Sequence, residues 1–162
     1  MSKTMDFILD PPRGVSPVEI GMPYQEALQA VSQWGVPEIR EPRPPRRPTG
    51  RFLLGRGTMD IVVHLERGER VDAVELWRFE GDDPDLRVLL NGVDVFRTPA
   101  AEIMQDLRSR GHQVDDSDPE NPMVRGVTLG FTRDTAQEVP RTEAGLPLFF
   151  TSVLVAAEDY YE

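Results

Sequence analysis

The side chains that most often transfer protons or bind metals are scarce in this sequence. Its 162 residues include two histidines and no cysteine, so disulfides, thiolate metal sites and cysteine nucleophiles are excluded. His64 lies inside an alternating apolar run, and His112 directly follows a glycine. Neither histidine has a carboxylate or a second histidine at ligand spacing beside it. We therefore interpret both as surface or partly buried residues without a chemical role.

An acidic run at residues 112–122, HQVDDSDPENP, is the first place to look for a bound cation. Three acidic side chains alternate from Asp116 onward, which resembles the start of a calcium loop. The sixth position is Asn121 where that loop needs glycine, and the twelfth is Val127 where it needs glutamate. We interpret the run as a solvated acidic turn, and we expect no metal and no cofactor. Its candidate partner-binding residues are Asp115, Asp116 and Asp118.

Other arrangements that support catalysis are also weakly represented. None of the serines lies in the strand-turn-helix setting of a nucleophile elbow. The segment Gly55-Arg56-Gly57 is too short to bind phosphate and lacks the lysine and hydroxyl that should follow it. The 28 Asp and Glu residues leave a glycosidase-like pair open, but no pair is singled out. The sequence favours a protein that is not an enzyme, without deciding the question.

A proline- and arginine-rich segment at residues 38–50, EIREPRPPRRPTG, is the clearest change of composition. Its prolines favour an extended backbone over a packed element. One interpretation is a basic arm that binds an acidic partner or phosphate, and its candidate residues are Arg43, Arg46 and Arg47. The other is a solvated surface loop that lies against the protein's own carboxylates. The second is favoured, because 17 of the 18 basic residues are arginines, a usage typical of a GC-rich genome.

Overall charge limits the class of partner. The net charge of −10 and the pI near 4.7 argue against affinity for nucleic acid or for an anionic membrane surface. With 39% hydrophobic and 28% charged residues, the composition is that of a soluble globular chain. The first residues contain no apolar run of signal-peptide length, so we expect a cytoplasmic protein.

Two stretches have the apolar spacing of short amphipathic helices. Residues 21–37 begin with a proline at the first turn, carry a stripe of four apolar side chains and end at Gly35. Residues 99–111 repeat the pattern at an offset of 76 positions, with proline, glutamate, glutamine and glycine at matching places. A degenerate tandem repeat is one interpretation, and it stays open. The stripe of the first helix is Ala27, Leu28, Val31 and Trp34.

Strand patterns account for most of the remaining chain. From residue 51 to residue 96 the apolar period is two, which predicts an antiparallel meander that ends in a tight Asn91-Gly92 hairpin. Two last strands are expected at 124–132 and 148–156. Residues 1–13 are expected to form a mobile tail or a short edge strand, and residues 14–162 a single globular domain. The predicted fold is α+β: an antiparallel sheet of about six to seven strands with two principal helices on one face.

One family resemblance adds to this prediction. Gly21-Met22, Glu26-Ala27 and Gly35-Val36-Pro37 resemble the opening segment of domains with the beta-lactamase-inhibitor-protein-like fold, an opening that small outer-membrane-assembly lipoproteins share. The resemblance covers about seventeen residues, and Pro23 stands where serine or threonine is usual. It implies helices packed against an antiparallel sheet, at times duplicated, and a role in binding other proteins. It assigns no functional residue.

Two classes of function follow from these observations. The first is a non-catalytic cytoplasmic protein-binding module, such as an immunity or regulatory protein, that binds a basic partner protein through its acidic surface. The second is a small-ligand-binding protein or an enzyme with its site in the concavity between sheet and helices.

Overall fold

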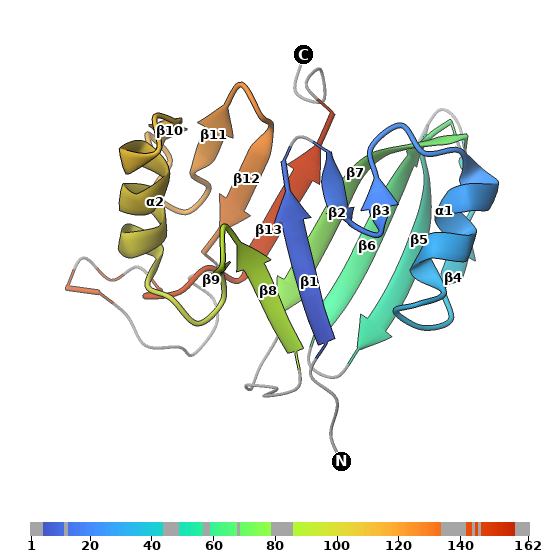
Figure 1. Cartoon of the computed structure of the whole chain (residues 1–162), viewed down its shortest axis with the longest axis horizontal. Helices are drawn as coiled ribbons and strands as arrows, with labels where there is room; N and C mark the ends of the chain where they lie inside the picture. Colours follow the sequence, from blue (N-terminus) through green and yellow to red (C-terminus); the bar gives the residue numbers. More distant parts are fainter. Residues whose placement is uncertain are drawn as a thin grey trace.

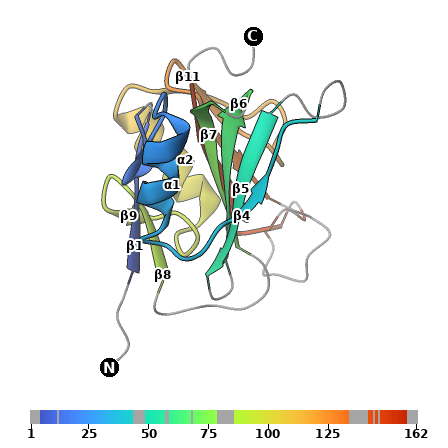
Figure 2. The ribbon, with the colours of Figure 1, turned by 90° about the vertical axis from the view of Figure 1, so that its right-hand side faces the viewer.

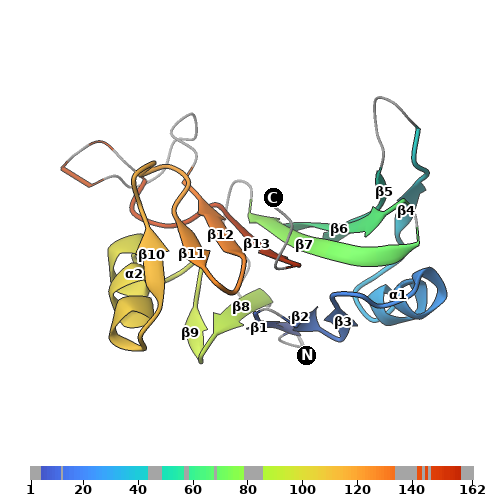
Figure 3. The same ribbon diagram turned by 90° about the horizontal axis from the view of Figure 1, so that it is seen from above.

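The computed structural model describes residues 5–11, 13–43, 49–56, 59–67, 69–78, 86–133, 142–143, 145 and 147–157. Its main element is an eight-stranded sheet, with a five-stranded sheet and two helices on one side of it (Figures 1 and 3). The strands of the large sheet are β4 (Glu38–Arg40), β5 (Thr49–Arg56), β6 (Met59–Glu66), β7 (Arg70–Arg78), β10 (Gln113–Asp115), β11 (Met123–Arg125), β12 (Leu129–Thr132) and β13 (Ser152–Ala156).

The large sheet is antiparallel throughout, in the order β10-β11-β12-β13-β7-β6-β5-β4. Strands β5, β6 and β7 form the predicted meander, because short turns join strands with alternating apolar residues. Their inward residues are buried and their outward residues are half-buried or exposed. The sheet holds eight strands instead of six to seven. Two of them, β4 and β10, are three-residue edge strands with weak sequence patterns, and β11 and β12 replace one expected strand.

The smaller sheet packs against the inner side of the large one. It consists of β1 (Met5–Asp10), β2 (Gly14–Ser16), β3 (Val18–Glu19), β8 (Leu86–Leu90) and β9 (Val93–Asp94), in the order β3-β2-β1-β8-β9. The segment expected as a tail or edge strand therefore forms β1, which lies between β2 and β8 and buries Phe7 completely. Strand β8 pairs with β1 in parallel and with β9 across the Asn91-Gly92 turn. This hairpin therefore belongs to the second sheet and not to the meander.

The two predicted helices are α1 (Tyr24–Val31) and α2 (Ala100–Ser109). Both lie on the same side of the large sheet as the smaller sheet (Figures 2 and 3). Trp34 follows α1 and is only 3% exposed, and its ring centroid lies 5.3 Å from that of Phe7. Trp34 is therefore a core residue, as the helical spacing predicts. Within the described residues, no helix is long and apolar enough to cross a membrane.

One predicted strand is a hairpin. The expected strand at 124–132 is divided by a turn into β11 and β12, which pair with each other. Gly126 and Thr128 have positive φ values of 89° and 41°, a conformation that ends a strand. The apolar residues on both sides of the turn make the segment look continuous when it is read as sequence alone.

The order of elements in residues 5–78 resembles the order in residues 86–156. Each part begins with strands of the small sheet, continues with one helix and ends with four strands of the large sheet. The four strands of each part are neighbours, and the parts meet where β7 pairs with β13. Elements that are far apart in the sequence therefore lie side by side at two places, β1 with β8 and β7 with β13 (Figure 1).

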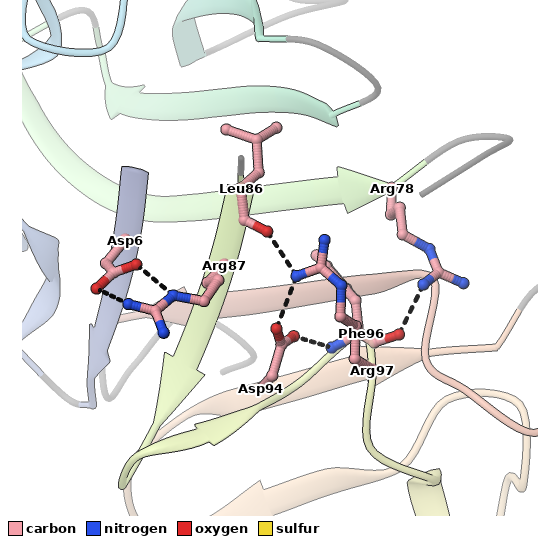
Figure 4. A network of polar contacts seen from close by, with 7 residues as sticks. All are labelled: Asp6, Arg78, Leu86, Arg87, Asp94, Phe96 and Arg97. Atoms are coloured by element: carbon pink, nitrogen blue, oxygen red, sulfur yellow. Dashed lines mark hydrogen bonds and ion pairs between the residues drawn. The ribbon is translucent and has the colours of Figure 1, made fainter. Parts of the chain in front are cut away.

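Ion pairs and hydrogen bonds hold the small sheet together along the β1–β8 pair. The Asp6 carboxylate accepts two hydrogen bonds from the Arg87 guanidinium, both at 2.7 Å (Figure 4). The two residues are 81 positions apart in sequence and directly opposite in the parallel register. The pair is partly exposed, so it fixes the register more than it stabilises the fold.

Hydrogen bonds from two arginines also hold the segment between β9 and α2 in place. Arg97 donates to the Leu86 carbonyl at 2.6 Å and to the Asp94 carboxylate at 2.8 Å. Arg78, at the end of β7, donates to the Phe96 carbonyl at 2.6 Å, so it connects the large sheet to the approach to α2 (Figure 4). These bonds satisfy the carbonyls of Leu86, the first residue of β8, and of Phe96, which lies between β9 and α2.

Candidate functional site

The partner-binding residues expected from the sequence do not form one site. Arg43 is exposed and follows β4, at one edge of the large sheet, beside a hollow of about 240 Å³ that Glu38, Arg40 and Glu41 also line. Arg46 and Arg47 lie outside the described residues. Asp115 ends β10, which is the opposite edge of the same eight-stranded sheet.

The acidic turn is engaged by the protein's own side chains. The Ser117 hydroxyl and amide and the Arg125 guanidinium all donate to the Asp115 carboxylate, and these bonds hold its pKa well below the ordinary value. Asp116 forms an ion pair with Arg108 at 3.2 Å. Asp118 accepts hydrogen bonds from the Glu120 amide and the Asn121 side chain. All three candidate partner-binding carboxylates therefore already bind groups of the protein itself.

A cluster of three side chains on the outer face of the large sheet was not expected. We call the outer face the side turned away from the small sheet and the helices. His64 on β6 lies with Nε2 2.5 Å from Glu75 Oε1, and the Trp77 indole on β7 donates to Glu75 Oε2 at 3.1 Å. The His64 and Glu75 side chains are 14% and 23% exposed. The cluster is therefore partly shielded from water, although it lies in the middle of an open sheet face.

The environment of Glu75 keeps its carboxylate ionised. Burial alone would raise its pKa, but the hydrogen bond and charge of His64, the indole hydrogen bond and the charge of Arg51 together outweigh that effect. The pKa of Glu75 consequently lies below its ordinary value of 4.5. At neutral pH a negative charge thus lies among half-buried side chains, where its interactions are screened less than at an exposed position.

The outer face around this cluster is mixed in character. Side chains of alternate residues on β5, β6, β7 and β13 point to it, as the pairing registers require. In the part of the chain that the structure describes, no helix or strand lies across it (Figure 3). An open antiparallel face is usually polar, whereas this one presents half-buried apolar residues between its charges. They are Leu53, Val62, Trp77 and Leu154.

A hollow of about 300 Å³ opens on the outer face next to Glu75. Strands β7, β13 and β12 and the segment before β11 surround it. By contrast, the concavity between large sheet and helices, which the sequence suggested for a small ligand, is filled by buried side chains of the small sheet such as Phe7, Val15 and Val88. Among the described residues, no three His, Asp or Glu side chains are grouped closely enough to hold a metal ion.

Sequence reasoning missed the pairing of His64 with Glu75 because the two residues are eleven positions apart. Their contact needs the β6–β7 turn and the bulge between His64 and Leu65, which shifts the register. The polar turn at 66–70 was the available signal, because a hairpin there brings the two strands together. Comparisons add no relative: no family model, no curated protein and no solved structure matches this chain.

Proposed function

We propose that this chain is a non-catalytic cytoplasmic protein-binding module, of immunity or regulatory type, that binds a basic partner protein. The observation that carries the proposal is the uncovered outer face, where apolar side chains surround the ionised Glu75. Protein interfaces combine an apolar centre with a polar rim in this way. The polar residues around it include Asp60 and Glu66, which are exposed on β6.

Charge supports the choice of partner. A net charge of −10 favours fast association with a basic protein and disfavours acidic ones. The resemblance of the first helix to beta-lactamase-inhibitor-protein-like domains supports a role in binding proteins, and the repeated order of elements supports a tandem duplication of such a unit. We propose both as interpretations of this chain.

The test begins with recovery of partners from the native host at low and at high salt. The expected result is a basic protein in stoichiometric amount whose complex weakens as salt rises, because surface charges are screened. Purified partner and chain are then compared by stopped-flow kinetics over the same salt range. An association rate that does not respond to salt would contradict the electrostatic part of the proposal.

Matched variants locate the binding face. Val62→Glu adds a carboxylate to the outer face directly opposite Glu75, and we expect it to abolish the complex. Val36→Glu makes the same chemical change at a side chain that is 95% exposed and lies outside this face, and we expect it to bind as the wild type does. If both variants bind the partner equally well, the outer face is not the interface.

The alternative, a small-ligand-binding protein or an enzyme, keeps one supporting observation. The hollow beside Glu75 has polar side chains on its wall and a carboxylate with a perturbed pKa. It is open to solvent at the surface of the sheet, and a ligand there would be bound less completely than in an enclosed cavity. A thermal-shift screen of metabolites against the purified chain tests this alternative directly.

A further inference from the structure

The hollow beside Glu75 has a shape set by the residues that alternate across three strands. Along one row, Glu75 on β7 lies opposite Leu154 on β13, and Leu154 lies opposite Gly130 on β12. Gly130 has no side chain, so the space above it stays open between Glu75 and the segment before β11. The volume of about 300 Å³ is large enough for one long side chain.

Hydrogen-bond acceptors dominate the wall of the hollow. The two oxygens of Glu75 offer about four acceptor positions, and His64 and Trp77 use one on each oxygen. The Ser152 side chain lines the hollow, is only 4% exposed, and makes no hydrogen bond with the described residues. Two acceptor positions of a carboxylate and one buried hydroxyl are therefore open to a ligand that donates.

The remaining polar groups are already fixed. The Thr132 hydroxyl donates to Asn121 Oδ1 at 3.2 Å, and Asn121 Nδ2 donates to Asp118 at 3.1 Å. These bonds use the Thr132 hydroxyl hydrogen and one of the two Asn121 amide hydrogens, and they place the Asp118 carboxylate next to Asn121. The electrostatic character of the hollow is negative, and an anionic or phosphorylated ligand does not suit it.

The other walls are apolar. Leu154, Pro122 and Met123 line the hollow next to the polar groups. Such a wall suits an alkyl stem that carries a cation at its end. A guanidinium fits better than an ammonium, because it is planar, weakly hydrated and able to donate in several directions to a carboxylate and a hydroxyl at once.

We propose that this hollow binds an arginine side chain of the partner protein, with the guanidinium on Glu75 and Ser152 and its methylene groups on Leu154. The inference rests on the proposed function, because it names the side chain by which a basic partner is recognised. It assigns a specific role to residues that neither the charge of the chain nor its motifs single out.

The test uses Nα-acetyl-argininamide as a probe on the full-length protein. The chain has two tryptophans, and the indole N–H signals are followed by two-dimensional NMR. The Trp77 indole donates to Glu75, so its signal should shift and saturate at millimolar probe. The Trp34 indole belongs to a side chain that is 3% exposed in the core and should not move. Absence of a saturable Trp77 shift would overturn the proposal.

Two further probes separate charge from shape on the unaltered protein. Nα-acetyl-citrullinamide keeps the shape of arginine without the charge, and Nα-acetyl-lysinamide keeps a charge without the planar group. Both are expected to bind roughly tenfold more weakly, or not at all, since a hydrogen bond to a charged group is lost or misplaced. Equal binding of either probe would overturn the assignment to arginine.

Variants then identify the residues. Glu75→Gln should weaken the arginine probe by roughly tenfold, whereas Glu66→Gln, the same change at an exposed position of β6, should not. The outcomes separate the two proposals. A salt-sensitive complex without probe binding would refute the arginine site alone. Probe binding without any protein complex would refute the proposed function alone.

Discussion

Replacing Glu75 by glutamine removes one charge from the outer face and keeps nearly the same shape. Glu75 accepts hydrogen bonds from His64 and Trp77, and its side chain is 23% exposed. Glutamine keeps one acceptor oxygen for the Trp77 indole and turns an NH₂ group toward His64, so the hydrogen bond of His64 to an ionised carboxylate is lost. A hydrogen bond to a charged group contributes about 1.5–3 kcal/mol, and partial exposure places this one at the lower end. We expect a loss of about 1–2 kcal/mol in the free energy of unfolding at neutral pH.

The pH dependence of that loss provides a second, independent check. The pKa of Glu75 is lower in the native protein than its ordinary value of 4.5, so the native state binds fewer protons than the unfolded state. Its contribution is therefore fully present above pH 4.5 and is lost as the pH falls through the native pKa. Because glutamine does not titrate, the stability difference between wild type and variant should shrink in acid.

Urea unfolding followed by tryptophan fluorescence measures both effects. Glu66→Gln is the control: its carboxylate is exposed on β6 and accepts no hydrogen bond among the described contacts, so we expect a change below about 0.5 kcal/mol. A Glu75→Gln difference equal to that of the control would refute the reasoning. So would a difference that stays constant through the acid range in which Glu75 titrates.

Three further substitutions test other parts of the structure. Trp34→Ala should cost about 3–5 kcal/mol in urea unfolding, because the ring is 3% exposed and packs on Phe7. Gly92→Val should cost about 1–2 kcal/mol or more, because φ is 79° there, and thermal melts of Gly92→Asn should show a smaller loss. Arg125→Ala should raise the pKa of Asp115, yet leave it below its ordinary value because Ser117 still donates; NMR titration of the carboxyl measures this.

The parts of the fold that depend on local sequence could be predicted. Both helices follow from apolar spacing between a proline and a glycine, and the Asn91-Gly92 turn has the positive φ values, 53° and 79°, that its residue types predict. The division into two sheets could not be predicted, because it depends on the parallel pairing of β1 with β8, 81 positions apart along the chain. A single sequence contains no periodic signal for such a contact.

The candidate site was hidden for a related reason. His64 and Glu75 are ordinary residues of two strands when each strand is considered alone, and only the register across the turn at 66–70 makes them neighbours. Asp115 and Asp116 are easy to find in the sequence, but only the fold shows that Arg125 and Arg108 form ion pairs with them, and their role in partner binding stays a prediction. Composition shows how many charges a chain has, whereas the fold determines which of them remain available.

The two long-range strand pairs also determine how this chain can be divided. Strands β1 and β7 precede residue 79, and strands β8 and β13 follow residue 85. The pairs β1–β8 and β7–β13 therefore each join a strand from the first part to a strand from the second. During synthesis on the ribosome, β1 can pair with β2 as soon as both have emerged, but its other edge has no partner strand until β8 has emerged. Separate expression of the parts before and after this division should therefore yield two poorly soluble fragments that restore the native fold when they are co-expressed.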